Sequence, residues 1–334
     1  MRVGYVELAA RIGRAEFMSA SIWHGPVDAA EGEAGRRWHQ IVQPLSVETE
    51  AGAVALLGFA CDAGVARNGG RVGAAAGPAA IRDVLRNVPV HGVKLVADAG
   101  DIACIGDELE TAQAQLAGRV AGLLDAGQFP IVLGGGHEMA YGSFCGLEQH
   151  LAATHRANQP APRIGIINLD AHFDLRLSQS GNSGTPFRQI AERCAERQWT
   201  FNYCCLGVSR FSNTQSLFER AIQLGATWRL DEEMSGAMLD ESLAMLTRFL
   251  ASVDIVYLTV CLDVLPAATA PGVSAPAARG VALDVIEPLI DLVSESGKLR
   301  LADVAEMNPR FDIDQRTARV AARLVARIAE AMSR

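Results

Sequence analysis

Lysine is almost absent from this 334-residue sequence. Lys94 and Lys298 are the only lysines, and every other basic residue among the 30 is an arginine. With only two candidate lysines, catalysis through a lysine Schiff base is not favoured. The net charge of -8 and the lack of a basic block argue against nucleic acid as a partner. The arginines remain available to bind carboxylates.

The sequence also lacks an apolar segment that could cross a membrane. The strongly apolar run of residues 255–262 has only the length of a strand. Charged residues such as Glu7 and Arg11 interrupt the N-terminal segment before the apolar core of a secretory signal could form. The seven cysteines form no CxxC pair, and this usage is typical of a reducing compartment. These absences predict a cytoplasmic protein without a membrane partner.

Short apolar runs alternate with longer helical patterns along the chain. Several runs are apolar on both faces, as expected for strands that helices cover on both sides. The alternation predicts an α/β fold, a single three-layer α/β/α domain with a mostly parallel sheet of about eight strands. We expect the domain to span residues 51–334 after an N-terminal arm of residues 1–50. The predicted strands lie within residues 54–62, 94–101, 130–137, 163–172, 202–210, 226–231, 254–263 and 299–309.

Three of these strand ends carry side chains that bind metals. The segment DAHFD, residues 170–174, would place two carboxylates and an imidazole on one face, because alternate residues of an extended chain point the same way. A polar strand end that only caps a turn would look similar. His137 follows three glycines, and Cys261 and Asp263 end another strand. Since ligand sites of parallel sheets gather beyond the carboxyl ends of the strands, we expect the three ends to converge.

This convergence predicts a site for two divalent metal ions. Buried acids cannot stay ionised without cations, and two ions would neutralise them and activate water near neutral pH. The predicted ligands are His137, Asp170, His172, Asp174, Cys261 and Asp263.

The motifs GGGHE, DAHFD, TVCLDVLP and AEMNP, in this order and spacing, resemble those of the ureohydrolase superfamily of arginases and agmatinases. The resemblance runs from about residue 54 to the end and includes GRVGAAAGPAAIR at residues 70–82. The segments SGNSGTPFRQ, VSRFSNT and LPAATAPGVSAPAARG are most similar to the formimidoylglutamases within it. Those enzymes hydrolyse N-formimidoyl-L-glutamate to L-glutamate and formamide in histidine degradation. The resemblance therefore implies an arginase-like fold, a binuclear metal hydrolase and a homo-oligomer.

The resemblance also implies a role for each metal ligand. His137 and Asp174 would bind one ion, and His172 and Asp263 the other. Asp170 would bridge the two ions, which are usually manganese in this family.

At position 261 the sequence departs from the family pattern. The common second bridging carboxylate is replaced by Cys261. A thiolate there would favour zinc, iron or cobalt over manganese, whereas a neutral thiol would weaken the site. This departure leaves open another hypothesis, in which the protein is a metal-poor homologue that binds ligands without catalysis.

The substrate contacts follow from the same resemblance. Asp174 would pass a proton to the departing nitrogen, and Glu306 would hold the amidinium through a charge-assisted pair. The two carboxylates of formimidoylglutamate need donors, for which Arg176 is the first candidate. Arg210 and three loop residues are further candidates, although each arginine could equally form a structural salt bridge. The loop residues are Asn182, Ser183 and Gly184.

A guanidino-group hydrolase, such as an agmatinase or guanidinobutyrase, is the alternative in the same fold. Arg176 would repel cationic agmatine, and the loop of residues 178–187 lacks the histidine that arginases carry there. In the N-terminal arm, Trp23 and Trp38 could cover the pocket or pack on the domain.

Overall fold

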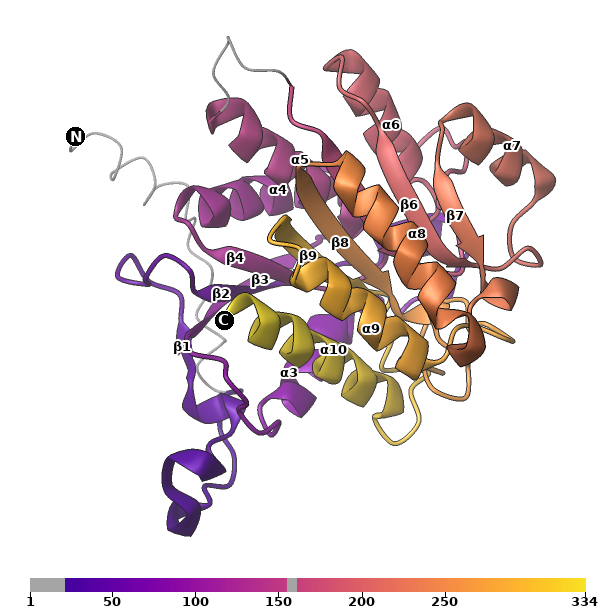
Figure 1. Cartoon of the computed structure of the whole chain (residues 1–334). Helices are drawn as coiled ribbons and strands as arrows, with labels where there is room; N and C mark the ends of the chain where they lie inside the picture. The colour runs from indigo at the N-terminus through magenta and orange to yellow at the C-terminus, as the bar shows by residue number, and fades with distance from the viewer. Residues whose placement is uncertain (1–21, 155–160) are drawn as a thin grey trace.

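The predicted three-layer α/β/α fold is confirmed in the computed structural model, which describes residues 22–154 and 161–334 (Figure 1). Nine strands form one sheet in the order β1-β3-β2-β4-β9-β8-β5-β6-β7, and every neighbouring pair is parallel. All eight predicted strands are present, and β1 is the ninth. The strands are β1 (Val42–Pro44), β2 (Val54–Ala60), β3 (Val96–Ala103), β4 (Phe129–Leu133), β5 (Ile164–Leu169), β6 (Asn202–Val208), β7 (Thr227–Leu230), β8 (Ile255–Cys261) and β9 (Leu299–Ala305).

Helices cover both faces of the sheet (Figure 1). Successive strand residues point to opposite faces, so Leu56 and Leu57 of β2 enter separate apolar cores. The core with Leu56 packs under α3, α8, α9 and α10, and the core with Leu57 under α4 to α7. The helices are α2 (Ala63–Arg67), α3 (Gly77–Leu85), α4 (Leu109–Asp125), α5 (Met139–Thr154), α6 (Pro186–Glu196), α7 (Gln215–Gln223), α8 (Leu239–Ser252), α9 (Leu283–Ser294) and α10 (Arg316–Met332).

The described part of the N-terminal arm packs on the domain. Trp38 is buried in the core, and Trp23 Nε1 donates a hydrogen bond to Asp98 Oδ2 at 2.7 Å. Strand β1 extends the sheet beside β3. The first 21 residues of the predicted arm lie outside the described residues, and its boundary at residue 50 stays a prediction.

Four neighbouring central strands, β4, β9, β8 and β5, determine where the predicted ligands lie. Leu169 is level with Val260, and Val260 with Val304, so the next residues along, Asp170 and Cys261, emerge side by side. After β4 the chain turns through glycines that other side chains could not replace. A Cβ at Gly134 would lie 2.3 Å from the carbonyl oxygen of Val304.

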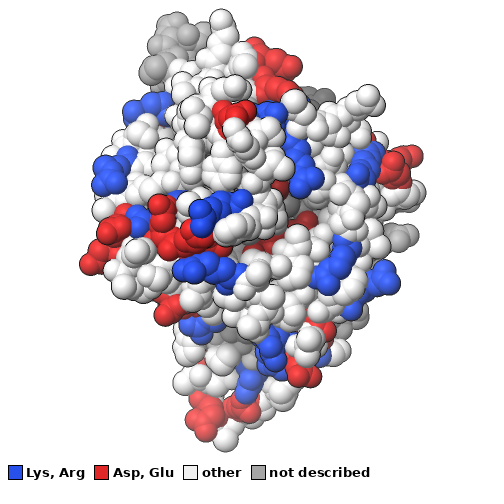
Figure 2. All heavy atoms as spheres, turned by 90° about the vertical axis from the view of Figure 1, so that its right-hand side faces the viewer, with Lys and Arg blue, Asp and Glu red and all other residues white. Residues whose placement is uncertain are grey.

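The described surface carries charges of both signs (Figure 2). On the face shown in Figure 2, acidic and basic side chains are interspersed without a broad area of one sign. Within residues 22–154 and 161–334, no helix combines the length and the hydropathy that a membrane crossing requires.

Candidate metal centre

His137 lies in the turn between β4 and α5 and is almost fully buried. Its backbone N–H donates to Glu306 Oε1 at 3.0 Å, and its Nε2 lies 3.0 Å from Thr259 Oγ1. The other ring nitrogen, Nδ1, lies 2.9 Å from Asp170 Oδ2 and 3.0 Å from Asp174 Oδ2. Neither contact has hydrogen-bond geometry, so Nδ1 is a buried polar atom without a partner among the described residues. Such an atom, facing two carboxylates, fits a metal ligand.

The segment after β5 supplies the next three ligands. Asp170 is fully buried, and its Oδ1 accepts a hydrogen bond from the backbone N–H of His172 at 2.7 Å. Asn168 Nδ2 donates to Asp170 Oδ2 at 3.0 Å and holds the carboxylate in place. Phe173 is buried in the core, while Asp174 adopts a left-handed backbone (φ 49°) that turns its side chain toward His137.

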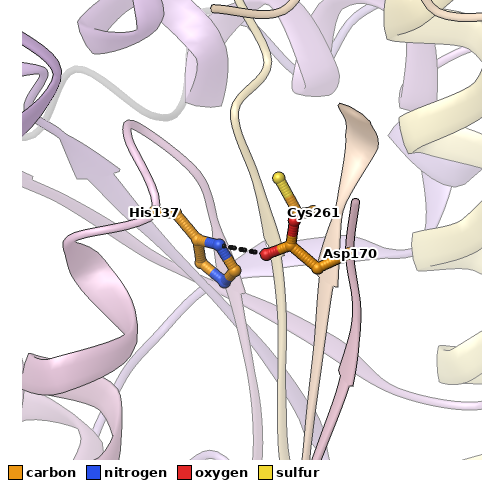
Figure 3. Close-up of side chains that lie close together, drawn as sticks. All are labelled: His137, Asp170 and Cys261. Carbon is orange, nitrogen blue, oxygen red and sulfur yellow. Dashed lines mark ion pairs between the residues drawn. The ribbon is translucent and has the colours of Figure 1, made fainter. Parts of the chain in front are cut away.

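The end of β8 completes the cluster. Asp263 Oδ2 lies 3.2 Å from His172 Nδ1, and Asp263 Oδ1 has no hydrogen-bond partner among the described residues. Cys261 lies beside Asp170 and His137 at the carboxyl end of the strand (Figure 3). Burial, together with the charges of Asp170 and Asp263, raises the pKa of the Cys261 thiol well above its usual range. The sulfur therefore stays protonated unless a cation lies against it.

Protons on the two imidazoles offset the charge of the carboxylates. Burial lowers the pKa of His137 and His172, but the adjacent carboxylates outweigh burial and raise the pKa of both well above the ordinary value. Burial alone would raise the pKa of Asp170, but its contacts with these histidines outweigh burial and leave that pKa below its ordinary value. Burial, followed by the charge of Asp170, raises the pKa of Asp174 to about 6 and also raises the pKa of Asp263. A bound cation would displace the imidazole protons and stabilise all the carboxylates.

The donor atoms form two groups that share one residue. His137, Asp170 and Cys261 offer ligand atoms within 4.8 Å of one another, and so do Asp170, His172 and Asp263. Asp170 belongs to both groups, as expected for a carboxylate that bridges two ions. The two groups contain five of the six ligands predicted from the sequence, and the sixth, Asp174, lies 3.0 Å from His137 Nδ1, so the cluster fits a binuclear centre.

Comparison with known proteins identifies the family. The profile of the Arginase family matches residues 52–330. The chain belongs to the arginase family. A formimidoylglutamase from Ralstonia nicotianae is 62% identical over 314 residues, which cover 94% of this chain and 96% of that protein. A formimidoylglutamase from Aeromonas hydrophila subsp. hydrophila is 55% identical over 307 residues, 91% of this chain and 96% of that protein.

Solved structures agree with this assignment. The crystal structure of Trypanosoma cruzi formiminoglutamase with Mn²⁺ matches with a TM-score of 0.74 and 25% identity, over 86% of this chain and 96% of that one. The family membership and this similarity confirm the arginase-like fold that the motifs predicted.

In this arginase-family chain, one cavity joins the metal ligands to several of the predicted substrate residues. Glu306 and Ser183 line it as buried residues, and Arg176 lines it as an exposed one. The residues that line the cavity are Asn68, His137, His172, Asp174, Arg176, Ser183, Ser212, Asn213, Leu217, Cys261, Asp263, Ser274, Ala275 and Glu306.

Three of the predicted substrate residues do not line the cavity. Arg210 pairs instead with Glu232, Nε to Oε1 at 3.0 Å. Asn182 uses its side-chain oxygen within the loop, where it accepts a hydrogen bond from the backbone N–H of Gly184 at 2.9 Å. Gly184 in turn accepts from the backbone N–H of Arg176. Asn182 and Gly184 therefore shape the loop that carries Ser183.

No motif or periodicity of the sequence points to Asn68, Ser274 or Thr259. Asn68 and Ser274 lie in Gly-rich or Pro-rich loops, where sequence periodicity carries no information about side-chain direction. Ser274 at least falls within the APGVSAP segment that resembles the formimidoylglutamases. Thr259 is fully buried on β8 and contacts a predicted ligand, which its place in an apolar run does not reveal.

Removing the Thr259 hydroxyl should weaken metal binding. Thr259→Val keeps the side-chain shape but leaves His137 Nε2 without the contact that orients the ring. We expect the affinity for divalent metal to fall by about 10- to 100-fold, the usual effect of losing such a partner. Competition with a chelator measures this affinity, and Thr259→Ser, which keeps the hydroxyl, is the control. Equal affinity in the valine and serine variants would contradict the orienting role.

Proposed function

We propose that this protein is a formimidoylglutamase that hydrolyses N-formimidoyl-L-glutamate to L-glutamate and formamide. The observation that carries the proposal is one cavity lined both by buried acids, Asp263 and Glu306, and by the exposed Arg176 with neutral donors. Asp263 and Glu306 face the space where a cationic amidine would lie, while Arg176 and Ser183 offer N–H and O–H groups for carboxylates. The substrate carries its cationic amidine next to the α-carboxylate and its γ-carboxylate at the far end of the side chain. The formimidoylglutamase relatives at 62% and 55% identity support this choice over a guanidino hydrolase.

We propose that the centre binds two divalent ions, with Mn²⁺ as the expected metal. His137 and Asp174 would hold one ion, and His172 and Asp263 the other, with Asp170 shared. When bound, the ions supply Lewis acidity and lower the pKa of a bound water molecule to near neutral pH. The Mn²⁺ in the Trypanosoma cruzi structure supports the choice of metal.

The protein's own groups would bind the amidine and transfer a proton to the departing glutamate nitrogen. Glu306 Oε1 is occupied by the His137 N–H, whereas Glu306 Oε2 is buried without a partner among the described residues and is free to accept an amidinium N–H. Asp174 also lines the cavity, where its carboxylate can take the proton that the attacking water releases. It would deliver this proton to the glutamate nitrogen as the bond from the amidine carbon to that nitrogen breaks. The amidine carbon then leaves as formamide, with oxygen from water.

A substrate panel tests the proposal. The purified protein, loaded with each of several divalent metals, is given formimidoylglutamate, agmatine and 4-guanidinobutyrate in parallel. We expect glutamate and formamide in equal amounts from the first substrate and little or no urea from the others. Release of urea from agmatine without formamide from formimidoylglutamate would establish the guanidino hydrolase instead. No turnover and less than one metal ion per chain after loading with manganese would favour the non-catalytic homologue.

Restoring the family's carboxylate at position 261 should suit the site to manganese. We expect Cys261→Asp to keep or raise activity with Mn²⁺, because a carboxylate is a harder ligand than a thiol of raised pKa. Activity and metal content are measured together across Mn²⁺, Zn²⁺ and Co²⁺. Loss of both bound metal and turnover in this variant would show that the sulfur is a required ligand.

Assembly into a homo-oligomer and a cytoplasmic location stay proposals that rest on the sequence. Light scattering of the purified protein measures the first.

A further inference from the structure

Asn68 lies at the end of α2, beside two of the proposed carboxylate donors. Its Nδ2 donates a hydrogen bond to Ser183 Oγ at 3.0 Å, and its Oδ1 accepts one from Arg176 Nη1 at 3.5 Å. All three side chains line the cavity. An amide can donate to the serine and accept from the arginine at the same time, so an asparagine suits this position.

The backbone around Asn68 is held independently of its side chain. Gly64 in α2 donates its N–H to the buried Glu138 Oε1 at 2.8 Å and accepts from the N–H of Ser183 at 3.1 Å. Arg67 Nη1 donates to the carbonyl oxygen of Gly181 at 3.1 Å. A Cβ at Gly64 would lie 2.5 Å from the Glu138 carboxyl carbon, which shows how closely α2 packs here. A change of the Asn68 side chain therefore leaves the helix and the loop in place.

The hydrogen bonds leave several donors free to reach a ligand. Ser183 Oγ accepts from Asn68, so its own O–H proton can point elsewhere. Asn68 Nδ2 carries a second hydrogen, and within the described residues the Arg176 guanidinium has no hydrogen-bond partner other than Asn68. Asn213, also in the wall, differs because its amide bonds to the backbone of Ala171, Phe173 and Ser209. The free donors thus cluster around Asn68, and none of the three side chains that supply them carries a negative charge.

We propose that Asn68 is a specificity-determining residue that, with Arg176 and Ser183, binds one carboxylate of the substrate. The proposal rests on the proposed function and deepens it by locating one anionic subsite. Asn68 keeps the arginine and the serine hydroxyl directed at the same point, and its second N–H contributes a further donor. Because the arginine is exposed, this fixed direction supplies selectivity that the charge alone would not.

The test is Asn68→Asp, which keeps the shape of the side chain. Aspartate cannot donate to Ser183, and its charge would pair with Arg176 and repel a carboxylate. We expect the KM for formimidoylglutamate to rise at least about tenfold, while kcat stays within about threefold, because the reacting end is untouched. Asn202→Asp, at the start of β6 and outside the cavity, adds the same charge and should leave the KM unchanged.

Two analogues show whether the effect acts through a carboxylate. N-formimidoyl-4-aminobutyrate lacks the α-carboxylate, and N-formimidoyl-2-aminobutyrate lacks the γ-carboxylate. For the analogue that lacks the carboxylate bound here, the KM should be nearly equal in wild type and Asn68→Asp. When Arg176→Gln is already present, Asn68→Asp should raise the KM by a much smaller factor than it does in the wild type, because the two residues bind the same group.

Three results would overturn this assignment. One is an unchanged KM in Asn68→Asp, and another is an equal rise in KM for the substrate and both analogues. The third is a fall in kcat together with lost metal, which would make Asn68 a support of the metal centre. If the wild type itself releases no formamide from formimidoylglutamate, the proposed function fails and the subsite fails with it. If the wild type releases formamide but any of the three results is found, the subsite is rejected and the proposed function stands.

Discussion

Asp170→Asn should abolish activity and leave the protein without its two metal ions. Asp170 is fully buried, belongs to both groups of ligand atoms and lies 2.9 Å from His137 Nδ1. An amide in its place removes the shared negative charge, and its NH₂ group cannot bind a metal. We expect turnover to fall by at least about 10⁴-fold, the scale of removing one member of a catalytic unit. Metal analysis after dialysis and a product assay measure the two effects.

A matched substitution separates this effect from the loss of any buried carboxylate. Asp231 follows β7, is also buried and does not line the cavity. Asp231→Asn should keep two metal ions per chain and most of the activity. A folded Asp170→Asn protein that retains both ions would contradict the bridging role.

Glu306→Gln should reduce kcat/KM by about 10²- to 10³-fold without loss of metal. Burial, followed by the charges of Glu138 and Asp263, raises the pKa of Glu306 to about 8, so a negative charge there is costly unless a cation lies beside it. An amidinium supplies that cation, and losing one partner of a desolvated charged pair costs about 2–5 kcal/mol. Steady-state kinetics with formimidoylglutamate measure the loss.

The glutamine variant should still fold. Its side-chain oxygen can accept the hydrogen bond from the His137 N–H, so the turn after β4 is preserved. Thermal unfolding and metal content should therefore match the wild type. Unchanged kcat/KM in a folded, metal-loaded variant would show that Glu306 does not contact the amidine.

The sheet was predictable because its strands are covered on both faces. Continuous apolar runs such as residues 255–261 are typical of strands covered on both faces, and all eight predicted strands are present. Strand β1 was not predicted, since it has three residues of which Gln43 and Pro44 are exposed. Its position beside β3 depends on contacts with Val96 and Asp98, more than 50 residues along the chain.

The ligand set was predictable for a related reason. Parallel strands end at one edge, so residues that follow β4, β8 and β5 come close together when β8 lies beside β5 and only β9 separates it from β4. The wall of the cavity comes from loops, and loop side chains are directed by distant partners. Arg210 is the clearest case, because Glu232 binds it away from the cavity. Asn68 is the opposite case, because it lines the cavity and donates a hydrogen bond to Ser183, which also lines it.

Metal-dependent release of glutamate and formamide is the central property to measure, and both products are followed while metal is restored. Metal-free protein is titrated with Mn²⁺ in the presence of formimidoylglutamate, and glutamate, formamide and ammonia are measured. We expect equal amounts of glutamate and formamide, no ammonia, and activity that rises until two ions are bound per chain. Full turnover in the presence of a chelator, or ammonia and N-formylglutamate as the products, would contradict this expectation.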